Sequence, residues 1–117
     1  MKIWVDDVRE PPEGYVWVRS TNEAIRFLAG RAVVGWLTDG RCEPVEVIDL
    51  DHDSGEFAKE GGDYIEVLKW VERYNNTCLS HNSPEELFLT SYHIHSMNPV
   101  GVQNMRAIIQ RNGWKEV

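Results

Sequence analysis

Three apolar stretches of this chain each stop abruptly at acidic or histidine residues. They are residues 2–5 before Asp6 and Asp7, residues 45–50 before Asp51, His52 and Asp53, and residues 87–94 before His95 and Ser96. Short apolar runs bounded by polar residues are typical of buried strands. Strands that alternate with helices predict an open, mostly parallel α/β sheet. Ligands bind such sheets beyond the carboxyl ends of the strands, so we expect the three polar endings to share one rim.

Capping signals and hydrophobic periodicity predict the remaining elements. Ser or Asp followed three residues later by Glu marks two helix starts, and Asn-Pro marks another. Glycine and asparagine mark the ends. The expected elements are a strand over 15–18, a helix from 21 to Gly30, a strand over 32–37, a turn over 38–41, a loop over 54–62, and helices over 63–74 and 98–112.

The length and composition suit one compact protein. The chain has 117 residues, which predicts a single domain over 1–117, and 42% of them are hydrophobic. No apolar run approaches the roughly 20 residues that a membrane span needs, and the first ten residues are too charged for a signal peptide. Cys42 and Cys78 have no metal-binding or redox spacing. We therefore expect a cytoplasmic protein with free thiols and no membrane partner.

The net charge limits the classes of partner. It is -7 at neutral pH, and broad binding to duplex nucleic acid depends on neutralising many phosphates with cationic side chains. An acidic chain instead suits a cation site that recruits a small phosphate group or a single nucleic-acid end.

The acidic strand endings predict a metal site. Asp6, Asp7, Asp51 and Asp53 would repel one another at one rim unless a cation neutralised them. Mg²⁺ prefers oxygen ligands and leaves positions for phosphate oxygens, so Mg²⁺ is the expected ion, with Mn²⁺ as the substitute. The alternative is that these residues are solvated turn residues and helix caps. Asp49 lies deeper in its strand, and we expect a supporting role for it at most.

Two histidines lie at the end of the third apolar run, His93 within it and His95 directly after it. His93 and His95 are two positions apart on a strand, so both project from the same face. An imidazolium next to a phosphate site can protonate an alkoxide leaving group. The alternatives are a transition-metal site or a structural role. His95 lies nearer the rim and is the better candidate.

The segment from Ser96 to Gly101 offers a second way to bind phosphate. Asn98 is expected to cap a helix whose free amides could hold an anion, and Gly101 would allow close approach. Arg9 could clamp a phosphate oxygen or only pair with a surface acid. His52 is equally compatible with a substrate-binding and a structural role. We expect the five tryptophans to be core or semi-exposed packing residues rather than a base-stacking platform.

Four segments stand out together: KIWVDDVREPPEGYVWVRSTNEAI, IDLDHDSGE, GGDYIEVLKWVE and HIHSMNPVG. They resemble the cyclic-phosphate processing receiver-like family, which is similar in fold to response-regulator receiver domains. The resemblance covers about residues 1–30 and 45–111. It implies a flavodoxin-like fold and, as proposed for the family, a role in processing cyclic-phosphate ends of RNA.

The resemblance also implies roles for single residues. Asp6 and Asp7 match the metal-binding acidic pair of receivers, Asp51 matches the phosphate-accepting aspartate, and Ser96 matches the conserved hydroxyl residue. Receivers also grip the phosphoryl group with a lysine at the end of a fifth strand. Here the chain leaves no room for a fifth strand and helix of normal length, so the fold is expected to be truncated after the fourth helix, with Lys115 as a weak substitute.

Other departures from the family concern insertions and the histidines. Residues 31–44 resemble an insertion, and Ser54 stands where the family tends to have leucine. The histidine segment puts imidazoles where receivers are usually apolar, which favours hydrolysis over signalling.

The leading hypothesis is a metal-dependent phosphoesterase that opens an RNA 2′,3′-cyclic phosphate end or a cyclic nucleotide. Either water or Asp51 would attack, and His95, less surely His93, would protonate the leaving oxygen. The alternatives are a receiver-type switch phosphorylated on Asp51, and a module that only binds a phosphorylated ligand.

Overall fold

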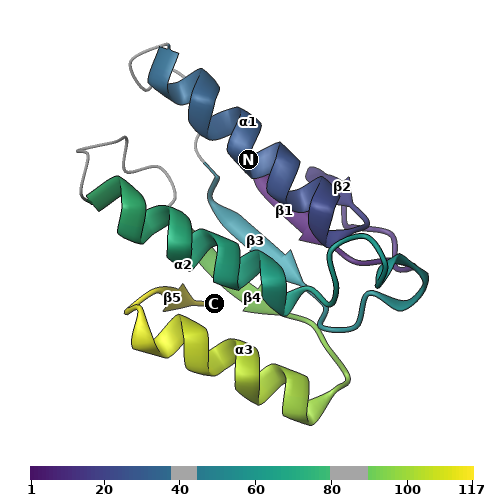
Figure 1. Cartoon of the computed structure of the whole chain (residues 1–117). Helices are drawn as coiled ribbons and strands as arrows, with labels where there is room; N and C mark the ends of the chain where they lie inside the picture. The colour runs from purple at the N-terminus through teal and green to yellow at the C-terminus, as the bar shows by residue number, and fades with distance from the viewer. Residues whose placement is uncertain (38–44, 80–89) are drawn as a thin grey trace.

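The computed structural model of the chain describes residues 1–37, 45–79 and 90–117, apart from the side chains of 32–37 and 77–79. In chain order the elements are β1 (Lys2–Val5), β2 (Tyr15–Val18), α1 (Thr21–Leu37), β3 (Val47–Leu50), the short 3-10 helix η1 (Gly55–Phe57), α2 (Ile65–Leu79), β4 (Ser91–Ile94), α3 (Pro99–Arg111) and β5 (Lys115–Glu116) (Figure 1). The five strands form one parallel sheet in the order β2-β1-β3-β4-β5. This confirms the predicted α/β class, and the strand order is the flavodoxin-like one.

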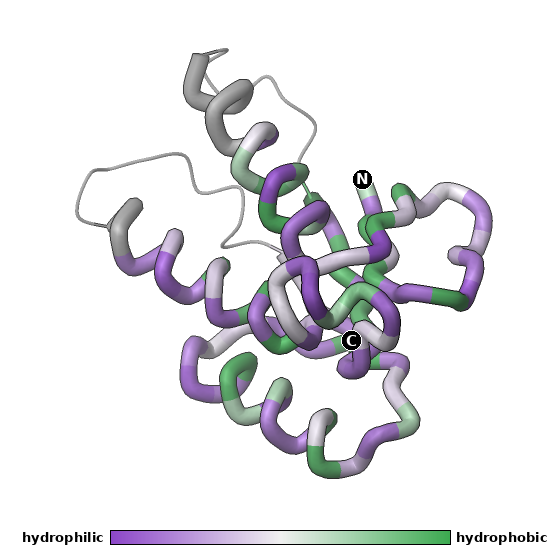
Figure 2. Tube along the Cα trace, turned by 45° about the vertical axis from the view of Figure 1, so that its right-hand side comes forward, coloured by the Kyte–Doolittle hydropathy of each residue, from purple (hydrophilic) through white to green (hydrophobic). Residues whose placement is uncertain are grey.

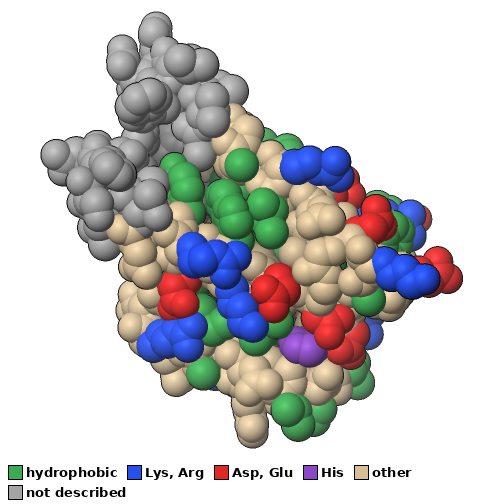
Figure 3. Space-filling view, viewed as in Figure 1, with side chains coloured by type: hydrophobic (Ala, Val, Ile, Leu, Met, Phe, Trp, Pro, Cys, Tyr) green, Lys and Arg blue, Asp and Glu red, His purple; other side chains and the backbone are tan. Residues whose placement is uncertain are grey.

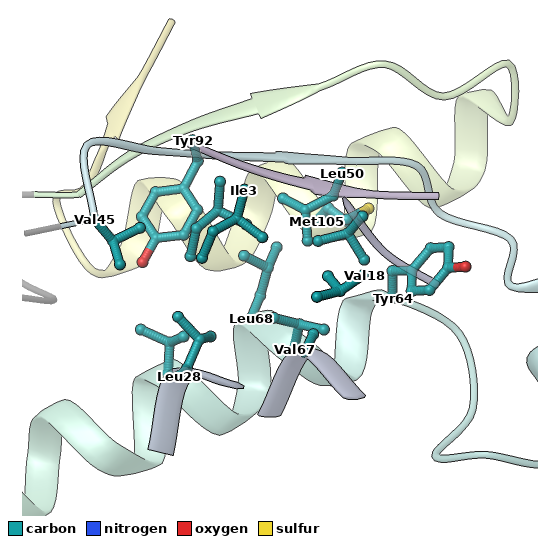
Figure 4. Close-up of a cluster of buried hydrophobic side chains, with 14 of the residues drawn as sticks. Ile3, Val18, Leu28, Val45, Leu50, Tyr64, Val67, Leu68, Tyr92 and Met105 are labelled. Carbon is teal, nitrogen blue, oxygen red and sulfur yellow. The ribbon is translucent and has the colours of Figure 1, made fainter. Parts of the chain in front are cut away.

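The three helices all cover the same face of the sheet. Figure 1 shows them side by side in front of the strands, and α2 contacts both α1 and α3. One buried cluster joins them to the strands, and in Figure 4 Leu68 of α2 and Met105 of α3 lie beside Ile3 and Leu50. Figure 2 shows the hydrophobic and hydrophilic residues alternating along α3, as expected for a helix with one buried side. No helix in the described part of the chain covers the opposite face, which we call the helix-free face.

Alternation along the strands determines which residues occupy the helix-free face. Ile3 and Val5 are buried in the core, so Trp4 between them projects the other way. In the sheet register Trp4 lies next to Trp17 on one side and Asp49 on the other, and Asp49 lies next to His93. Aromatic and ionisable side chains therefore share this face.

The connection from β1 to β2 explains why one face has no helix. Residues 6–14 join these two parallel strands as a loop, where a doubly wound fold ordinarily has a helix. The helix after β4, the fourth in a receiver, is consequently the third here. After it comes the two-residue strand β5.

The structure corrects the predicted end of the first helix. Ser20 caps α1 as expected, because its Oγ accepts a hydrogen bond from the Glu23 amide at 3.0 Å. However, α1 continues through Gly30 to Leu37, so the strand expected over 32–37 is wrong. Glycine ends a helix where it adopts a positive φ, as Gly113 does after α3 at 69°, and Gly30 does not. An isolated helical glycine costs only about 1 kcal/mol relative to alanine.

The later elements mostly agree with the predictions. α3 has Asn98 as its N-cap and Pro99 in its first turn. α2 runs beyond the expected stop at Asn75, which is buried within the helix, to Leu79. β3 starts at Val47, two residues later than expected. The turn expected over 38–41, Cys42 and residues 87–89 of the expected fourth strand lie outside the described residues.

The described helices were also compared with the requirements of a membrane span. None of them combines the length and the apolar character needed to cross a bilayer.

Candidate functional site

Three carboxylates meet beyond the carboxyl ends of β1 and β3. Asp6 and Asp7 follow β1 directly, and Asp51 follows β3, its neighbour in the sheet. One carboxylate oxygen from each lies within 4.8 Å of the others. We call these residues the acidic trio. The two strand ends thus come together at the switch point of the sheet, as the sequence predicted.

Both carboxylate oxygens of Asp6 are hydrogen-bonded within the protein. Its side chain is fully buried, and its Oδ1 accepts the amides of Val8 at 3.0 Å and Arg9 at 2.9 Å. Its Oδ2 lies 2.9 Å from Nε2 of His95. Burial alone raises the pKa of this carboxyl, but the two amides and His95 outweigh it and leave the pKa below its ordinary value. Asp6 is therefore an ionised carboxylate in a protein interior.

Asp7 has the opposite electrostatic balance. Burial raises the pKa of its carboxyl, and the negative charges of Asp6 and Asp51 raise it further. Gly55 packs tightly against it: a Cβ atom at Gly55 would lie 2.3 Å from Asp7 Oδ2, and the φ of Gly55 is 53°. The trio is thus a confined set of oxygen ligands with unbalanced negative charge, which is the chemistry that Mg²⁺ and Mn²⁺ fit.

His95 bridges two carboxylates. Its Nδ1 lies 2.5 Å from Asp49 Oδ1 and its Nε2 lies 2.9 Å from Asp6 Oδ2, so each ring nitrogen faces an acceptor. Burial lowers the pKa of the imidazole, but Asp49 and Asp6 outweigh this effect and raise the pKa above its ordinary value. The indole of Trp4 stacks on the ring at 4.0 Å between centroids. The two carboxylates accordingly favour the protonated form of His95 and fix the orientation of its ring.

Asp49 has a larger role than the sequence suggested. It is buried, and the same Oδ1 that binds His95 also lies 3.0 Å from Nδ1 of His93, whose side chain is 45% exposed. A carboxylate inside an apolar strand needs hydrogen-bonding partners. This requirement was the sequence feature that could have indicated a larger role for Asp49. Which histidines would satisfy it depends on strand register, which the sequence did not reveal.

Asp53 belongs to a different group from the acidic trio. Its Oδ1 lies 2.8 Å from Nδ1 of His52 and accepts a hydrogen bond from Nδ2 of Asn98 at 3.2 Å. Asp53, His52 and Asp63 form a separate cluster of potential ligands. The structure therefore does not bring Asp53 together with the other three aspartates expected to bind metal. Asp53 and His52 connect the chain after β3 to the start of α3.

The start of α3 is already occupied by protein groups. The Asn98 side chain accepts the Gly101 amide at 3.0 Å, and Ser96 Oγ accepts the Asn98 amide at 3.1 Å. The His52 ring packs on Gly101, where a Cβ atom would lie 2.4 Å from its Cγ. Gly101 was expected to let a phosphate approach the helix closely, but the His52 ring occupies that position instead.

Two arginines border the site. Arg9, a predicted phosphate clamp, is exposed, and its Nη1 donates to the backbone oxygen of His95 at 3.5 Å. Arg19, which the sequence analysis missed, donates from Nε and Nη2 to the backbone oxygen of Asp7 at 2.9 and 2.7 Å. Its guanidinium lies between the rings of Trp17 and Phe57. Figure 3 shows a histidine bordering acidic side chains at this end of the molecule, with basic side chains nearby.

Comparison with known proteins gives one family. The family model described as a cyclic-phosphate processing receiver domain matches residues 1–111. Neither the curated proteins nor the solved structures that were searched contain a match.

Proposed function

The chain belongs to the cyclic-phosphate processing receiver domain family, and from this premise we propose that it is a metal-dependent phosphoesterase that opens a cyclic phosphate. Membership by itself implies a role in cyclic-phosphate processing. The observation that carries the more specific proposal is the acidic trio, with the His95 ring in contact with Asp6.

Asp6, Asp7 and Asp51 would hold the ion, most favourably Mg²⁺. The oxygen-only donor set, the raised pKa of Asp7 and the tight contact with Gly55 all support this assignment. When bound, a divalent cation neutralises the carboxylates and polarises a phosphoryl group. Asp53 is left out of the metal site because it bonds to His52 and Asn98.

Each residue of the site then has a distinct role in opening the cyclic phosphate. Water attacks phosphorus, one phosphorus–oxygen ester bond of the ring breaks, and the departing alkoxide takes a proton. His95 Nε2 supplies that proton, because it is the imidazole nitrogen in contact with the acidic trio. The attacking water gives one proton to solvent and becomes a hydroxyl of the phosphomonoester, and the proton donor is reprotonated from solvent. Asp49 holds His95 in the protonated form and His93 supports Asp49, so both act as positioning residues. The exposed Arg9 guanidinium lies beside the backbone oxygen of His95. It would contact a phosphate oxygen of the substrate from the solvent side.

The test is a turnover assay on cyclic mononucleotides and RNA 2′,3′-cyclic ends with Mg²⁺, Mn²⁺ or EDTA, read by phosphorus NMR. Opening by the wild type should require the metal, and Asp51→Asn should abolish it. The neighbouring Asp53→Asn is the matched control and should retain most of the activity. Full metal-dependent turnover by Asp51→Asn would contradict the proposal.

The same assay separates the enzyme from a receiver-type switch. β5 pairs Lys115 with Ser91, the first residue of β4, so this lysine lies at the amino end of the sheet, away from the trio. It is not placed as the phosphate-gripping lysine of receivers is. Uptake of phosphate from acetyl phosphate on Asp51, without turnover of any cyclic phosphate, would establish a switch instead.

A further inference from the structure

The helix-free face is unusual for a parallel sheet. Parallel sheets nearly always have both faces covered, and here the three helices share one face. Most strand positions on the other face carry aromatic or ionisable side chains instead of the aliphatic residues that a packed helix would need; Val47 and Ser91 are the exceptions. Among the described residues no helix packs on this face; the loop from β1 to β2 reaches it at Arg9, whose backbone oxygen accepts a hydrogen bond from Nε1 of Trp4 at 2.9 Å.

The aromatic side chains form a connected row that reaches the acidic trio. Trp4 stacks on His95, and its ring meets Tyr15 edge to face at 5.8 Å between centroids. Trp17 is the register neighbour of Trp4, and its indole nitrogen donates to the backbone oxygen of Asp6 at 2.8 Å. These rings are half-buried. His95 covers one face of the Trp4 ring and the Arg19 guanidinium lies over the Trp17 ring. A group stacked on the parts of these rings that stay exposed would be next to the proposed phosphate site, because Trp4 contacts His95 and Trp17 contacts Asp6.

Cationic side chains accompany the row, although the chain is acidic overall. Lys2 Nζ lies 5.7 Å from the centre of the Tyr15 ring, and the Arg19 guanidinium lies 5.0 Å from that of Trp17. Lys115, paired with Ser91, is exposed at the far end of the same face. Asp49 is the acid at these strand positions, and it is buried against the two histidines.

We propose that the helix-free face binds the single-stranded RNA that leads to the cyclic end, with bases against the aromatic row and phosphates beside Lys2 and Lys115. This deepens the proposed function and rests on it for the position of the cyclic phosphate at the acidic trio. Aromatic rings combined with cations bind single strands without reading sequence, and open sheet faces with aromatic residues stack bases in other RNA-binding proteins. RNA is the occupant because a 2′,3′-cyclic phosphate requires a 2′-hydroxyl.

The geometry also predicts a preference for oligonucleotides over mononucleotides. Lys2 is two residues before Trp4, about 7 Å away along the strand at roughly 3.3 Å per residue. A mononucleotide at the trio would leave this lysine without a phosphate partner. An oligonucleotide would gain that contact.

The binding test uses a fluorescein-labelled RNA hexamer ending in a 3′-monophosphate, with Mg²⁺, read by anisotropy. Lys2→Glu and Lys115→Glu should each weaken binding by about fivefold or more and make it less sensitive to salt. Arg26→Glu, the same charge change on the exposed side of α1, should leave binding within about twofold of the wild type. Equal affinities for all four proteins would overturn the proposal. So would a dimer of the free protein that Lys2→Glu dissociates, because the face would then be a self-association surface.

Turnover separates this proposal from the one on which it rests. Lys2→Glu should lower kcat/KM for a hexamer with a cyclic end and leave kcat/KM for a cyclic mononucleotide unchanged. If the mononucleotide is opened but the hexamer is neither bound nor opened better, the RNA surface is wrong and the phosphoesterase stands. If nothing is opened but hexamer binding still falls in Lys2→Glu, the surface stands and the phosphoesterase is wrong.

Discussion

Replacing Asp49 with asparagine tests the charge arrangement behind the acidic trio. The substitution keeps the size of the side chain and removes the negative charge that His95 and His93 share. His95 is only 10% exposed, whereas His93 is 45% exposed. A buried hydrogen bond to a charged group contributes about 1.5–3 kcal/mol, and an exposed one about 0–1 kcal/mol. We therefore expect Asp49→Asn to lower the free energy of unfolding by about 3 kcal/mol in metal-free buffer.

The loss should depend on pH in a defined direction. The folded-state pKa of His95 is raised, so the stability from its protonation is complete below its unfolded pKa and is lost as the pH rises through the folded value. The pKa of Asp49 is lowered, so its contribution is complete above its unfolded pKa and is lost as the pH falls through the folded value. The difference between wild type and variant is therefore largest at about pH 4–6.5.

Urea denaturation of both proteins with EDTA, at about pH 5.5 and about pH 9, measures this difference. NMR titration of the His95 ring provides an independent check, since its pKa should fall in the variant. A difference in unfolding free energy that is the same at both pH values, or an unchanged pKa of His95, would refute the proposed charge arrangement.

Two further predictions concern contacts that hold the helices in place. Gly101→Ala places a Cβ atom 2.4 Å from the His52 ring and should cost about 1–3 kcal/mol of unfolding free energy; His52→Ala in the same chain should restore part of it, and no recovery would show that the ring is not the obstacle. Glu72 links α2 to Arg111, and this pairing, with Asn112, lowers the pKa of Glu72 to about 2. Because a lowered pKa adds stability above the unfolded value of about 4.5, Glu72→Gln should cost about 0.5–1 kcal/mol at neutral pH. The cost should shrink as the pH falls toward about 2, and chemical denaturation at several pH values would show whether it does.

The sequence by itself determined the strands and helix ends whose signals come from residues close together in the chain. Apolar runs that stop at charged residues identified β1, β3 and β4 because burial of a strand is visible in its own side chains. Asn98 and Pro99 identified the start of α3 because capping involves only the first turn. Alternation of these elements then predicted both the parallel sheet and the rim where Asp6, Asp7 and Asp51 meet.

Only the tertiary structure decided how distant segments pair. Asp49 faces His93 because of strand register, and a shift of one residue would have turned it into the core. Asp53 separates from the acidic trio because it bonds to the neighbouring His52 and, across the gap between β3 and α3, to Asn98. The sequence analysis expected core or semi-exposed packing for Trp4 and Trp17, and both rings are half-buried. The three helices pack on one face through contacts between segments far apart in the chain, and the loop from β1 to β2 supplies no helix for the other face, on which these two rings lie.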